Sequence, residues 1–542
     1  MLREWRGSLG SHDVVIVGSG AAGLTAALAA QGAGASVAVL EKADYFGGAS
    51  AVSGGVLWIP LNGRMREFGL TDDRDAALRY LQRLTAGRTD AAILRAVVDR
   101  GNELLTFLDD VAGLRFVAMA NFPDYHPEWD GAHAGGRSLD PELYDASVLG
   151  DLGAALRPDP RLPFTMREYE EWGTFTRFPW DELASRAARG VVARGRALVA
   201  PLLQACAQAG VTLATGVAAQ RLLVTDSRVR GIVTGGGRRI EAGTAVILAC
   251  GGFEWSARMK ADFLPGPLDA TCGPPHNTGD GIRMASRAGA ALANMQEAWW
   301  FPMLQLPGEE LDGQPTGTLL RFERTAPHTI IVNRAGRRFV NEAHNYNDMT
   351  KAFHVFDPHS YTYANLPAWL IFDQQHLEKY GFLAHRAGQP TPAWLVEAPT
   401  LAALAGRLGI DAAGLATTVA AFNVHAREGR DPEFRRGESA YDRYWGDREA
   451  TYPALGPVER APFYGVEVKS GAIGTKGGIV TDGDGRALDA FGEAIPGLFA
   501  AGNTTAHPMG PGYPGAGGTL GPGCTMAYLA GQACVREAAA VR

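Results

Sequence analysis

The stretch Asp13-Val-Val-Ile-Val-Gly-Ser-Gly-Ala-Ala-Gly23 decides the fold of this chain. Its first five residues form an apolar, β-branched run that is typical of a buried strand. The next six match the pattern GxGxxG, and an alanine-rich segment with helical character follows at residues 24–33. A second apolar run, residues 37–40, leads directly to Glu41. The order strand, glycine turn, helix, strand and acid predicts a βαβ unit that binds a dinucleotide.

The glycines of this turn have separate predicted roles. Gly18 permits the tight turn, Gly20 lets the backbone approach a pyrophosphate, and Gly23 lets the helix pack closely on the strand. The helix N-terminus offers free N–H groups and a partial positive charge to the phosphates. The carboxylate of Glu41 is expected to accept hydrogen bonds from a ribose diol. Because NAD and FAD share the ADP half, the motif alone does not identify the dinucleotide.

A second glycine- and serine-rich segment, Gly47–Gly55, follows shortly after Glu41. Backbone-rich loops of this kind can wrap a long, extended ligand, although a surface loop has a similar composition. The chain has only one good GxGxxG, whereas enzymes that bind NAD(P)H beside FAD usually show two. The pattern therefore favours a flavoprotein whose substrate meets the flavin directly.

Composition narrows the functional class. With 542 residues, the chain is long enough for about three to four structural units. The 58 acidic residues exceed the 51 Lys and Arg, so the net charge of −7 argues against nucleic acid as the main partner. Five cysteines without a CxxC pair predict neither a disulfide framework nor a metal site. Without a signal-type or membrane-spanning apolar run, a cytoplasmic protein is expected, with peripheral membrane contact left open.

The amino-acid composition changes along the chain. Residues 307–473 are richer in aromatic residues, His and Pro than the glycine-rich segments on either side. We expect an α/β protein whose Rossmann-like nucleotide domain is split into residues 1–306 and 474–542. Residues 307–473 would form an inserted α+β capping domain that carries the substrate site. Residues 118–165 are predicted to be a long functional loop.

As a set, the motifs of this chain resemble the fumarate reductase/3-ketosteroid dehydrogenase superfamily of FAD enzymes. The resemblance implies extended FAD in the first domain, a cap over the isoalloxazine, and a last helix directed at the flavin pyrimidine ring. Gly47–Gly55 contains no His for covalent attachment, so FAD is expected to be non-covalent. The motifs that carry the resemblance are Val14–Gly23, Glu41, Gly47–Gly55, Ala249–Phe253, Thr278–Gly281, Ile331–Asn333, Arg338–Glu342 and Gly497–Asn503.

The resemblance also implies a set of FAD contacts. They are Gly18, Gly20, Ala21, Ala22, Gly23, Glu41, Lys42, Gly48, Ala49, Ser50, Ser53, Gly54, Gly55, Val217, Ala249, Gly251, Gly252, Asp280, Gly502, Asn503, Thr519 and Leu520.

The chain departs from the fumarate branch of this superfamily at the positions that bind dicarboxylates. That branch has an Arg proton donor after the Arg-Phe-x-Asn-Glu run, where this chain has Tyr346. It has another Arg before the final Leu-Gly, where this chain has Thr519, and a late His where this chain has Thr475-Lys476. Without these cations, a buried dicarboxylate would be poorly paired, which argues against fumarate as the substrate.

The residues present instead resemble the 3-ketosteroid Δ1-dehydrogenases. In that family, the Tyr at the position of Tyr346 removes a proton from C2, and the Tyr at the position of Tyr125 assists it. The hydroxyl of Tyr513 and the N–H of Gly517 would hold the C3 ketone. Alignment through residues 118–165 is loose, so Tyr144 and Tyr169 are alternatives to Tyr125.

The resemblance predicts an FAD-dependent desaturase of a cyclic ketone, with a 3-ketosteroid as the first choice of substrate. A cyclohexanone or oxocyclohexane derivative would use the same residues in a smaller pocket. A Δ4-type ketosteroid dehydrogenase ranks lower because Tyr513 is followed by Pro514-Gly515. A fumarate reductase-like enzyme ranks below it, and a flavin-binding sensor without turnover is the alternative from another class. The expected electron acceptor is external, such as a quinone.

Overall fold

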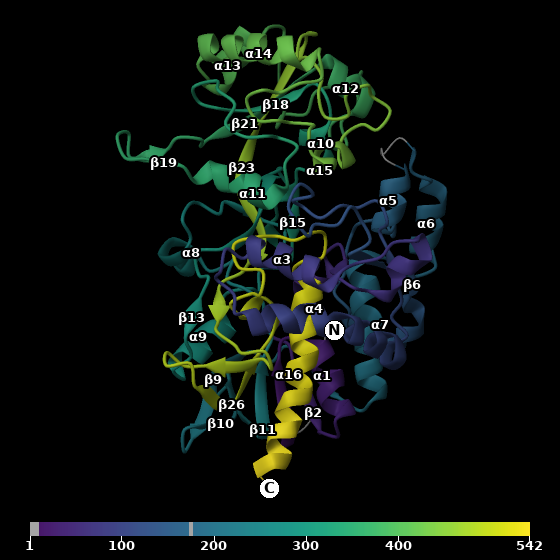
Figure 1. The fold of residues 1–542 in the computed structure, drawn as a ribbon, viewed down its shortest axis with the longest axis vertical. Coiled ribbons are helices and arrows are strands. Elements are labelled where there is room, and N and C mark those ends of the chain that lie inside the picture. Colours follow the sequence, from purple (N-terminus) through teal and green to yellow (C-terminus); the bar gives the residue numbers. More distant parts are fainter. Residues whose placement is uncertain (1–9, 173–176, 542) are drawn as a thin grey trace.

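The computed structural model describes residues 10–172 and 177–541, and its largest sheet has eight strands in this part of the chain (Figure 1). The main path runs in the order β25-β26-β11-β1-β2-β8, with the hairpin β9–β10 attached to β11. β1 lies in the middle, parallel to β2 and to β11. Its bounds and those of its neighbours are β1 His12–Val17, β2 Val37–Leu40, β8 Thr212–Ala214, β9 Ala219–Thr225, β10 Arg228–Thr234, β11 Arg239–Leu248, β25 Arg486–Leu488 and β26 Ala494–Ala500.

The two ends of the chain meet in this sheet. β26 pairs in parallel with β11, so a strand near the C-terminus completes a sheet that begins near the N-terminus. The helices α1 (Ala21–Gly32) and α16 (Leu520–Val541) pack against each other beside it (Figure 1). A Cβ at Gly531 would lie 2.5 Å from the Ala26 carbonyl oxygen, so glycine is what lets the two helices approach so closely. These contacts confirm the Rossmann-like architecture that the βαβ motif predicts.

A second sheet of seven strands in the described chain links this body to the cap, residues 307–473. Its long central strand β23 runs from the cap into the body (Figure 1). Two of its strands, β12 and β14, precede residue 307 and so belong to the body. We propose that the chain still divides into residues 1–306, 307–473 and 474–542, with this shared sheet joining the cap to the body. Its strands are β12 Ala270–Thr271, β14 Ala298–Leu304, β17 Thr318–Leu319, β18 Thr329–Asn333, β21 Ala368–Asp373, β22 Val396–Ala398 and β23 Phe463–Thr475.

Helices surround both sheets, and helices of the cap such as α13 and α14 lie at the top of the view in Figure 1. None of the helices in residues 10–172 and 177–541 combines the length and apolarity needed to cross a bilayer. The remaining helices are α2 Gly48–Ala51, α3 Arg74–Leu84, α4 Ala91–Ala112, α5 Met166–Trp172, α6 Trp180–Ala188, α7 Arg194–Gln208, α8 Ala257–Phe263, α9 Asp280–Arg287, α10 Phe322–Thr325, α11 Tyr346–Lys351, α12 Gln374–Tyr380, α13 Leu401–Leu408, α14 Ala412–Ala426 and α15 Ala440–Tyr444.

The predicted loop at residues 118–165 contains regular structure, which corrects the sequence-based expectation. β5 (Ser138–Pro141) lies between β3 (Leu57–Trp58) and β4 (Phe116–Ala118) in a small antiparallel sheet. β6 (Tyr144–Asp145) and a 3₁₀ segment, Ala146–Ala155, follow it. These elements are too short to show a hydrophobic period, so the sequence pattern does not reveal them.

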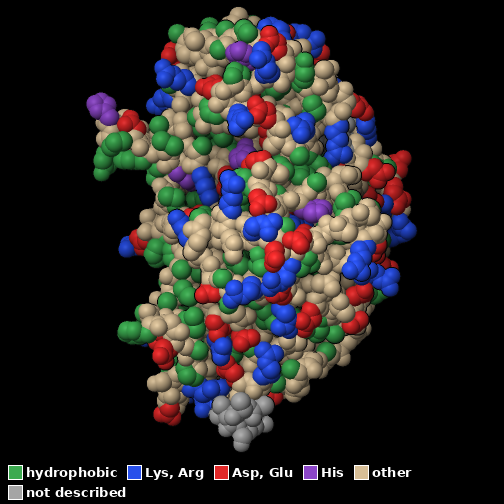
Figure 2. All heavy atoms as spheres, viewed as in Figure 1, with side chains coloured by type: hydrophobic (Ala, Val, Ile, Leu, Met, Phe, Trp, Pro, Cys, Tyr) green, Lys and Arg blue, Asp and Glu red, His purple; other side chains and the backbone are tan. Residues whose placement is uncertain are grey.

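Charged side chains of both signs are scattered over the face shown in Figure 2. One arm projects from this face and carries hydrophobic side chains (Figures 1 and 2). It consists of β19 (Phe356–Asp357), β20 (Thr362–Tyr363) and their turn, in which Tyr361 is 81% exposed.

Candidate active site

An open cleft with about 960 Å³ of empty space lies at the end of β1 where the glycine turn begins. Gly18 has φ +106°, a conformation that L side chains rarely adopt, as the predicted tight turn requires. A Cβ at Gly23 would lie 2.0 Å from the Gly18 carbonyl oxygen, so this position needs glycine for packing. At Gly20 the nearest atom to an added Cβ is Ser50 Oγ at 3.4 Å, which leaves its backbone open to a ligand.

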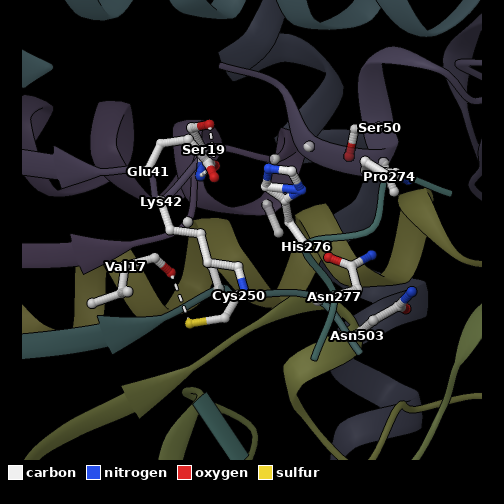
Figure 3. Close-up of a pocket in the computed structure, with 18 of the residues that line it drawn as sticks. Val17, Ser19, Glu41, Lys42, Ser50, Cys250, Pro274, His276, Asn277 and Asn503 are labelled. Carbon is white, nitrogen blue, oxygen red and sulfur yellow. Dashed lines mark hydrogen bonds between the residues drawn. The ribbon is translucent and has the colours of Figure 1, made fainter. Parts of the chain in front are cut away.

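The side chains after β2 are also arranged around this cleft (Figure 3). Glu41 is buried, and its carboxylate accepts hydrogen bonds from Ser19 Oγ at 2.7 Å and from the Ala43 N–H at 2.9 Å. Lys42 Nζ lies 2.6 Å from Asp280 Oδ2, which ties the first βαβ unit to α9. The acid that the motif predicts to bind a ribose is therefore held in place by the glycine turn itself.

Most of the expected FAD contacts line the cleft. They are Gly18, Gly20, Ala22, Glu41, Lys42, Gly48, Ala49, Ser50, Val217, Ala249, Gly251, Asp280, Gly502, Asn503, Thr519 and Leu520. The others are not among the lining residues, and two of them are glycines in tight space: a Cβ at Gly55 would lie 2.4 Å from the Arg194 backbone, and one at Gly252 would lie 2.2 Å from Thr475 Oγ1. Those outside the lining are Ala21, Gly23, Ser53, Gly54, Gly55 and Gly252.

The cleft also contains residues that sequence reasoning missed. Arg157 is fully buried in its wall and pairs with Asp312, yet its Nε and Nη2 atoms have no hydrogen-bond partner among the described residues. Unpaired buried guanidinium donors and open glycine backbone fit an anionic, extended ligand such as a dinucleotide. His276 and Asn277 also line the cleft, just before the Thr278–Gly281 motif (Figure 3). An isolated Arg157 gives no signal in the sequence.

Three tyrosines converge beside this cleft. The hydroxyl oxygens of Tyr125 and Tyr346 are 2.7 Å apart. The ring of Tyr513 lies 5.1 Å from that of Tyr125 and 5.4 Å from that of Tyr346, measured between centroids. The two sequence-based alternatives lie elsewhere, since Tyr144 donates to Gln204 and Tyr169 packs against Phe164. We call Tyr125, Tyr346 and Tyr513 the tyrosine site.

Neighbouring backbone and aromatic rings position the tyrosine site. Tyr346 is the first residue of α11, which Asn345 caps by accepting the Asp348 N–H at 3.0 Å. Phe301 on β14 stacks on Tyr346 with 4.0 Å between centroids. The Tyr125 N–H donates to the Pro514 carbonyl oxygen at 3.0 Å, which binds the N-terminal segment to the loop of Tyr513.

Two polar contacts connect the tyrosine site to the cofactor cleft. Thr519 lines the cleft, and its Oγ1 donates to the Tyr513 hydroxyl at 3.2 Å. Asn503 also lines the cleft and accepts a hydrogen bond from Trp299 Nε1 at 3.1 Å (Figure 3). The Trp299 ring lies 4.7 Å from that of Tyr513. A substrate held by Tyr513 would therefore lie next to the cleft.

The loop of Tyr513 offers a free donor. Within residues 10–172 and 177–541, the Gly517 N–H makes no hydrogen bond, whereas its carbonyl oxygen accepts the Trp58 N–H at 3.1 Å. Gly517 has φ +89°, and a Cβ there would lie 2.5 Å from the Val56 carbonyl oxygen. Lys476 is fully buried below this loop and donates to the Gly512 carbonyl oxygen at 2.7 Å. The loop geometry thus depends on glycine and on a buried lysine, whose pKa burial lowers well below its usual value.

Burial dominates the electrostatics of the tyrosine site. It raises the pKa of Tyr125 and of Tyr346 well above the usual value of 10, and neighbouring tyrosines add to the effect. The pKa of Tyr513 is also raised by burial, although the hydrogen bond from Thr519 opposes the shift. All three hydroxyls are therefore neutral donors before substrate binds.

Other histidines and aromatic residues near the tyrosine site lie at its edge or contact other parts of the chain. His126 Nε2 lies 2.8 Å from Asp348 Oδ2, and His344 completes this polar cluster below the tyrosine site. Trp300 packs on His354, and Phe322 packs on Tyr380, so neither contacts the three tyrosines. Tyr441 was missed by the sequence analysis, although its ring lies 4.9 Å from that of Tyr125.

Comparison with known proteins agrees with this geometry. Residues 13–520 match the FAD binding domain family. The chain is 50% identical to the 4-oxocyclohexanecarboxylate 2-dehydrogenase of Sinomonas cyclohexanicum, an alignment that covers 98% of this chain and 94% of that protein. It is 40% identical to the 3-oxosteroid 1-dehydrogenase of Mycobacterium tuberculosis H37Rv, with 96% and 97% covered.

A solved structure extends the similarity to three dimensions. The 3-ketosteroid Δ1-dehydrogenase of Sterolibacterium denitrificans, in complex with 1,4-androstadiene-3,17-dione, matches with a TM-score of 0.91 and 35% identity. The match covers 97% of this chain and all of that chain. The chain therefore belongs to the FAD binding domain family, and it is an FAD-dependent oxidoreductase related to the 3-ketosteroid dehydrogenases.

Proposed function

We propose that this enzyme desaturates a cyclic ketone at the bond next to its carbonyl group. The observation that carries the proposal is the 2.7 Å contact between the hydroxyls of Tyr125 and Tyr346, next to a ring of Tyr513 that adjoins the cofactor cleft. A neutral, aromatic site of this kind suits a ketone and has no paired cations for a dicarboxylate.

The ketone oxygen would accept two hydrogen bonds, one from the Tyr513 hydroxyl and one from the Gly517 N–H. As a proton leaves the α carbon, negative charge grows on this oxygen, and donors already in place stabilise it. Such a donor is typically worth about 3–4 kcal/mol to the transition state. Both donors lie on a loop that Lys476 and Trp58 hold rigid.

Tyr346 Oη would accept the α proton, and the hydroxyl of Tyr125 would stabilise the charge or share the proton with it. A buried phenolate is a strong base because the pKa of its phenol is high, but little of it is present at neutral pH. In the unliganded arrangement the contact with Tyr125 adds to the raised pKa of Tyr346. It would favour the ionised form of Tyr346 once the Tyr125 hydroxyl donates its hydrogen to Tyr346 Oη. When bound, FAD supplies the two-electron acceptor that desaturation requires.

The cofactor would be held by the backbone of the glycine turn, by Glu41 at the ribose and by the unpaired nitrogens of Arg157. We propose that FAD would be bound non-covalently and that the electrons removed from the substrate would leave to an external acceptor such as a quinone. Release of the flavin into the supernatant on acid precipitation would support non-covalent binding, and retention on the protein would contradict it.

For the substrate we now place an oxocyclohexane derivative first and a 3-ketosteroid second. This order reverses the preference drawn from the sequence. It is supported by the 50% identity to a 4-oxocyclohexanecarboxylate dehydrogenase, against 40% for a steroid enzyme. The steroid alternative is supported by the TM-score of 0.91.

Anaerobic mixing of the flavin-loaded enzyme with each ketone tests the proposal. We expect 4-oxocyclohexanecarboxylate to bleach the flavin absorbance and to yield the α,β-unsaturated product. Tyr346→Phe should keep its flavin and lose this bleaching. Since the base is a tyrosine whose pKa is raised, wild-type kcat/KM should increase with pH, by up to about tenfold per unit below that pKa.

Three outcomes would contradict parts of the proposal. Bleaching by a 3-keto-4-ene steroid alone would keep the reaction and reverse the order of substrates. Full activity of Tyr346→Phe would show that another group takes the proton. Absence of bleaching by any cyclic ketone, with reoxidation of the reduced enzyme by fumarate, would refute the desaturase assignment.

A further inference from the structure

We infer that Arg321 binds a carboxylate on the substrate ring, so that the enzyme acts on a cyclic keto acid rather than on a neutral ketone. This inference rests on the proposed desaturation of a cyclic ketone and names the substrate class of that same site. It assigns a specificity role to a residue outside the tyrosine site.

Arg321 lies one aromatic ring away from the proton-accepting tyrosine. It follows the buried Leu320 and precedes α10, where its own backbone leaves the extended conformation of β17. Its Cζ atom lies 5.8 Å from the centroid of the Phe301 ring. Phe301 in turn stacks on Tyr346 at 4.0 Å. The half-buried guanidinium thus lies beside the aromatic ring that stacks on Tyr346.

The Arg321 guanidinium has no counterion in the described part of the chain. Among residues 10–172 and 177–541, no carboxylate oxygen lies within 4.0 Å of it, and it donates no hydrogen bond to them. The neighbouring Glu323 uses its carboxylate to accept the Arg321 backbone N–H at 3.2 Å instead. Several other arginines of the cap have a carboxylate partner, as Arg338 has Glu342 at 2.7 Å and Arg436 has Glu342 at 3.1 Å. An unpaired guanidinium at the edge of a desolvated site is ready to bind an anion.

The positive charge acts on the tyrosine site. Burial raises the pKa of Tyr125, Tyr513 and Tyr441, and the charge of Arg321 opposes the shift in each case. We therefore expect the substrate site to combine neutral hydroxyl donors with a nearby cation. A ring that carries both a ketone and a carboxylate would match this combination. A steroid such as 1,4-androstadiene-3,17-dione has no anionic group to offer the cation.

Charge-selective kinetics test the inference. The variants are Arg321→Leu, Arg321→Lys and the control Arg448→Leu. Arg448 is also a cap arginine stacked on an aromatic ring, 4.8 Å from the Tyr444 centroid, but Glu170 lies 3.5 Å away as its counterion. The substrates are 4-oxocyclohexanecarboxylate and its uncharged methyl ester. Cyclohexanecarboxylate, which lacks the ketone, reports binding alone through its competitive inhibition and its effect on the flavin spectrum.

We expect Arg321→Leu to lower kcat/KM for the acid about 100-fold, mainly by raising KM, because a charge-assisted contact is lost. Activity with the ester should stay within about threefold of wild type. Arg321→Lys should restore part of the loss, and Arg448→Leu should leave both substrates unaffected. The dissociation constant of cyclohexanecarboxylate should rise in Arg321→Leu and stay unchanged in Arg448→Leu.

Two results would overturn the inference. The first is an unchanged kcat/KM for the acid in Arg321→Leu. The second is an equal loss for acid and ester with a displaced pH profile, which would mean that Arg321 acts on tyrosine ionisation. If wild type desaturates neither the acid nor the ester, the proposed function fails. The binding of cyclohexanecarboxylate, followed through the flavin spectrum, then tests the inference by itself. Weaker cyclohexanecarboxylate binding in Arg321→Leu would then support the inference, and equal binding would overturn it.

Discussion

The cofactor cleft is lined largely by residues of short contiguous motifs, such as the turn that begins at Gly18 and the loop Gly47–Gly55. The tyrosine site consists of side chains from positions 125, 346 and 513, which only the tertiary fold brings together. The first kind of site is encoded locally and tolerates changes elsewhere in the chain. The second kind depends on the packing of the cap against the body, so it should fail through supports that never touch the substrate.

The largest effect should come from breaking the local encoding of the cofactor cleft. Gly23→Val would push a side chain into the Gly18 carbonyl oxygen, which no rotamer can avoid. We expect FAD binding to be abolished, so that the purified variant is colourless. Gly32→Ala in the same helix is the control, since nothing lies within 4 Å of its added Cβ. A yellow Gly23→Val protein with full flavin content would refute the packing role.

The next effect should come from a support of the tyrosine site. Glu342 is fully buried between Arg338 and Arg436, and these cations hold its pKa below the usual value although burial opposes them. Glu342→Gln should lower the free energy of unfolding by about 3–5 kcal/mol, measured by denaturant unfolding of the cap. The control Glu433→Gln removes an exposed partner 3.8 Å from Arg338 and should cost less than about 1 kcal/mol. Equal stability of the two variants would mean that the buried network does not hold the cap.

The smallest of the three effects should come from the tyrosine site itself. Tyr513→Phe keeps the ring that packs on Trp299 and removes one donor to the ketone oxygen. We expect kcat to fall about 100- to 1,000-fold with flavin content and stability unchanged. Tyr144→Phe, whose hydroxyl contacts Gln204 far from the cleft, serves as the control. A change confined to KM would show that Tyr513 binds the ground state and the transition state equally.

The same contrast explains what the sequence could predict. The βαβ unit follows from periodicity and from glycines at fixed spacing, and the fold is as predicted. The resemblance to a known family identified Tyr346 and Tyr513. The sequence left three candidates for the assisting tyrosine, and the 2.7 Å contact with Tyr346 favours Tyr125 over Tyr144 and Tyr169. The roles of these residues stay predictions.

Two arginines mark the limit of sequence reasoning. Arg157 and Arg321 are ordinary basic residues in the sequence, without a motif around them. What distinguishes them is that guanidinium nitrogens of each have no hydrogen-bond or ion-pair partner among the described residues. This can be seen only when the positions of all neighbouring carboxylates are known. The strand at residues 138–141 was not predicted from the sequence for another reason. It has four residues and lies between two other strands, so it needs no hydrophobic period of its own.

The pairing of β26 with β11, and of α16 with α1, has a consequence for the order in which the protein matures. During synthesis the glycine turn leaves the ribosome first, but Asn503, Thr519 and Leu520 complete the cleft only after almost the whole chain has emerged. Until then α1 lacks its partner helix, and its apolar surface stays exposed to chaperones and proteases. We therefore expect stable FAD binding only after these late segments have been made, and we expect cellular FAD supply to affect how much of the newly made chain survives.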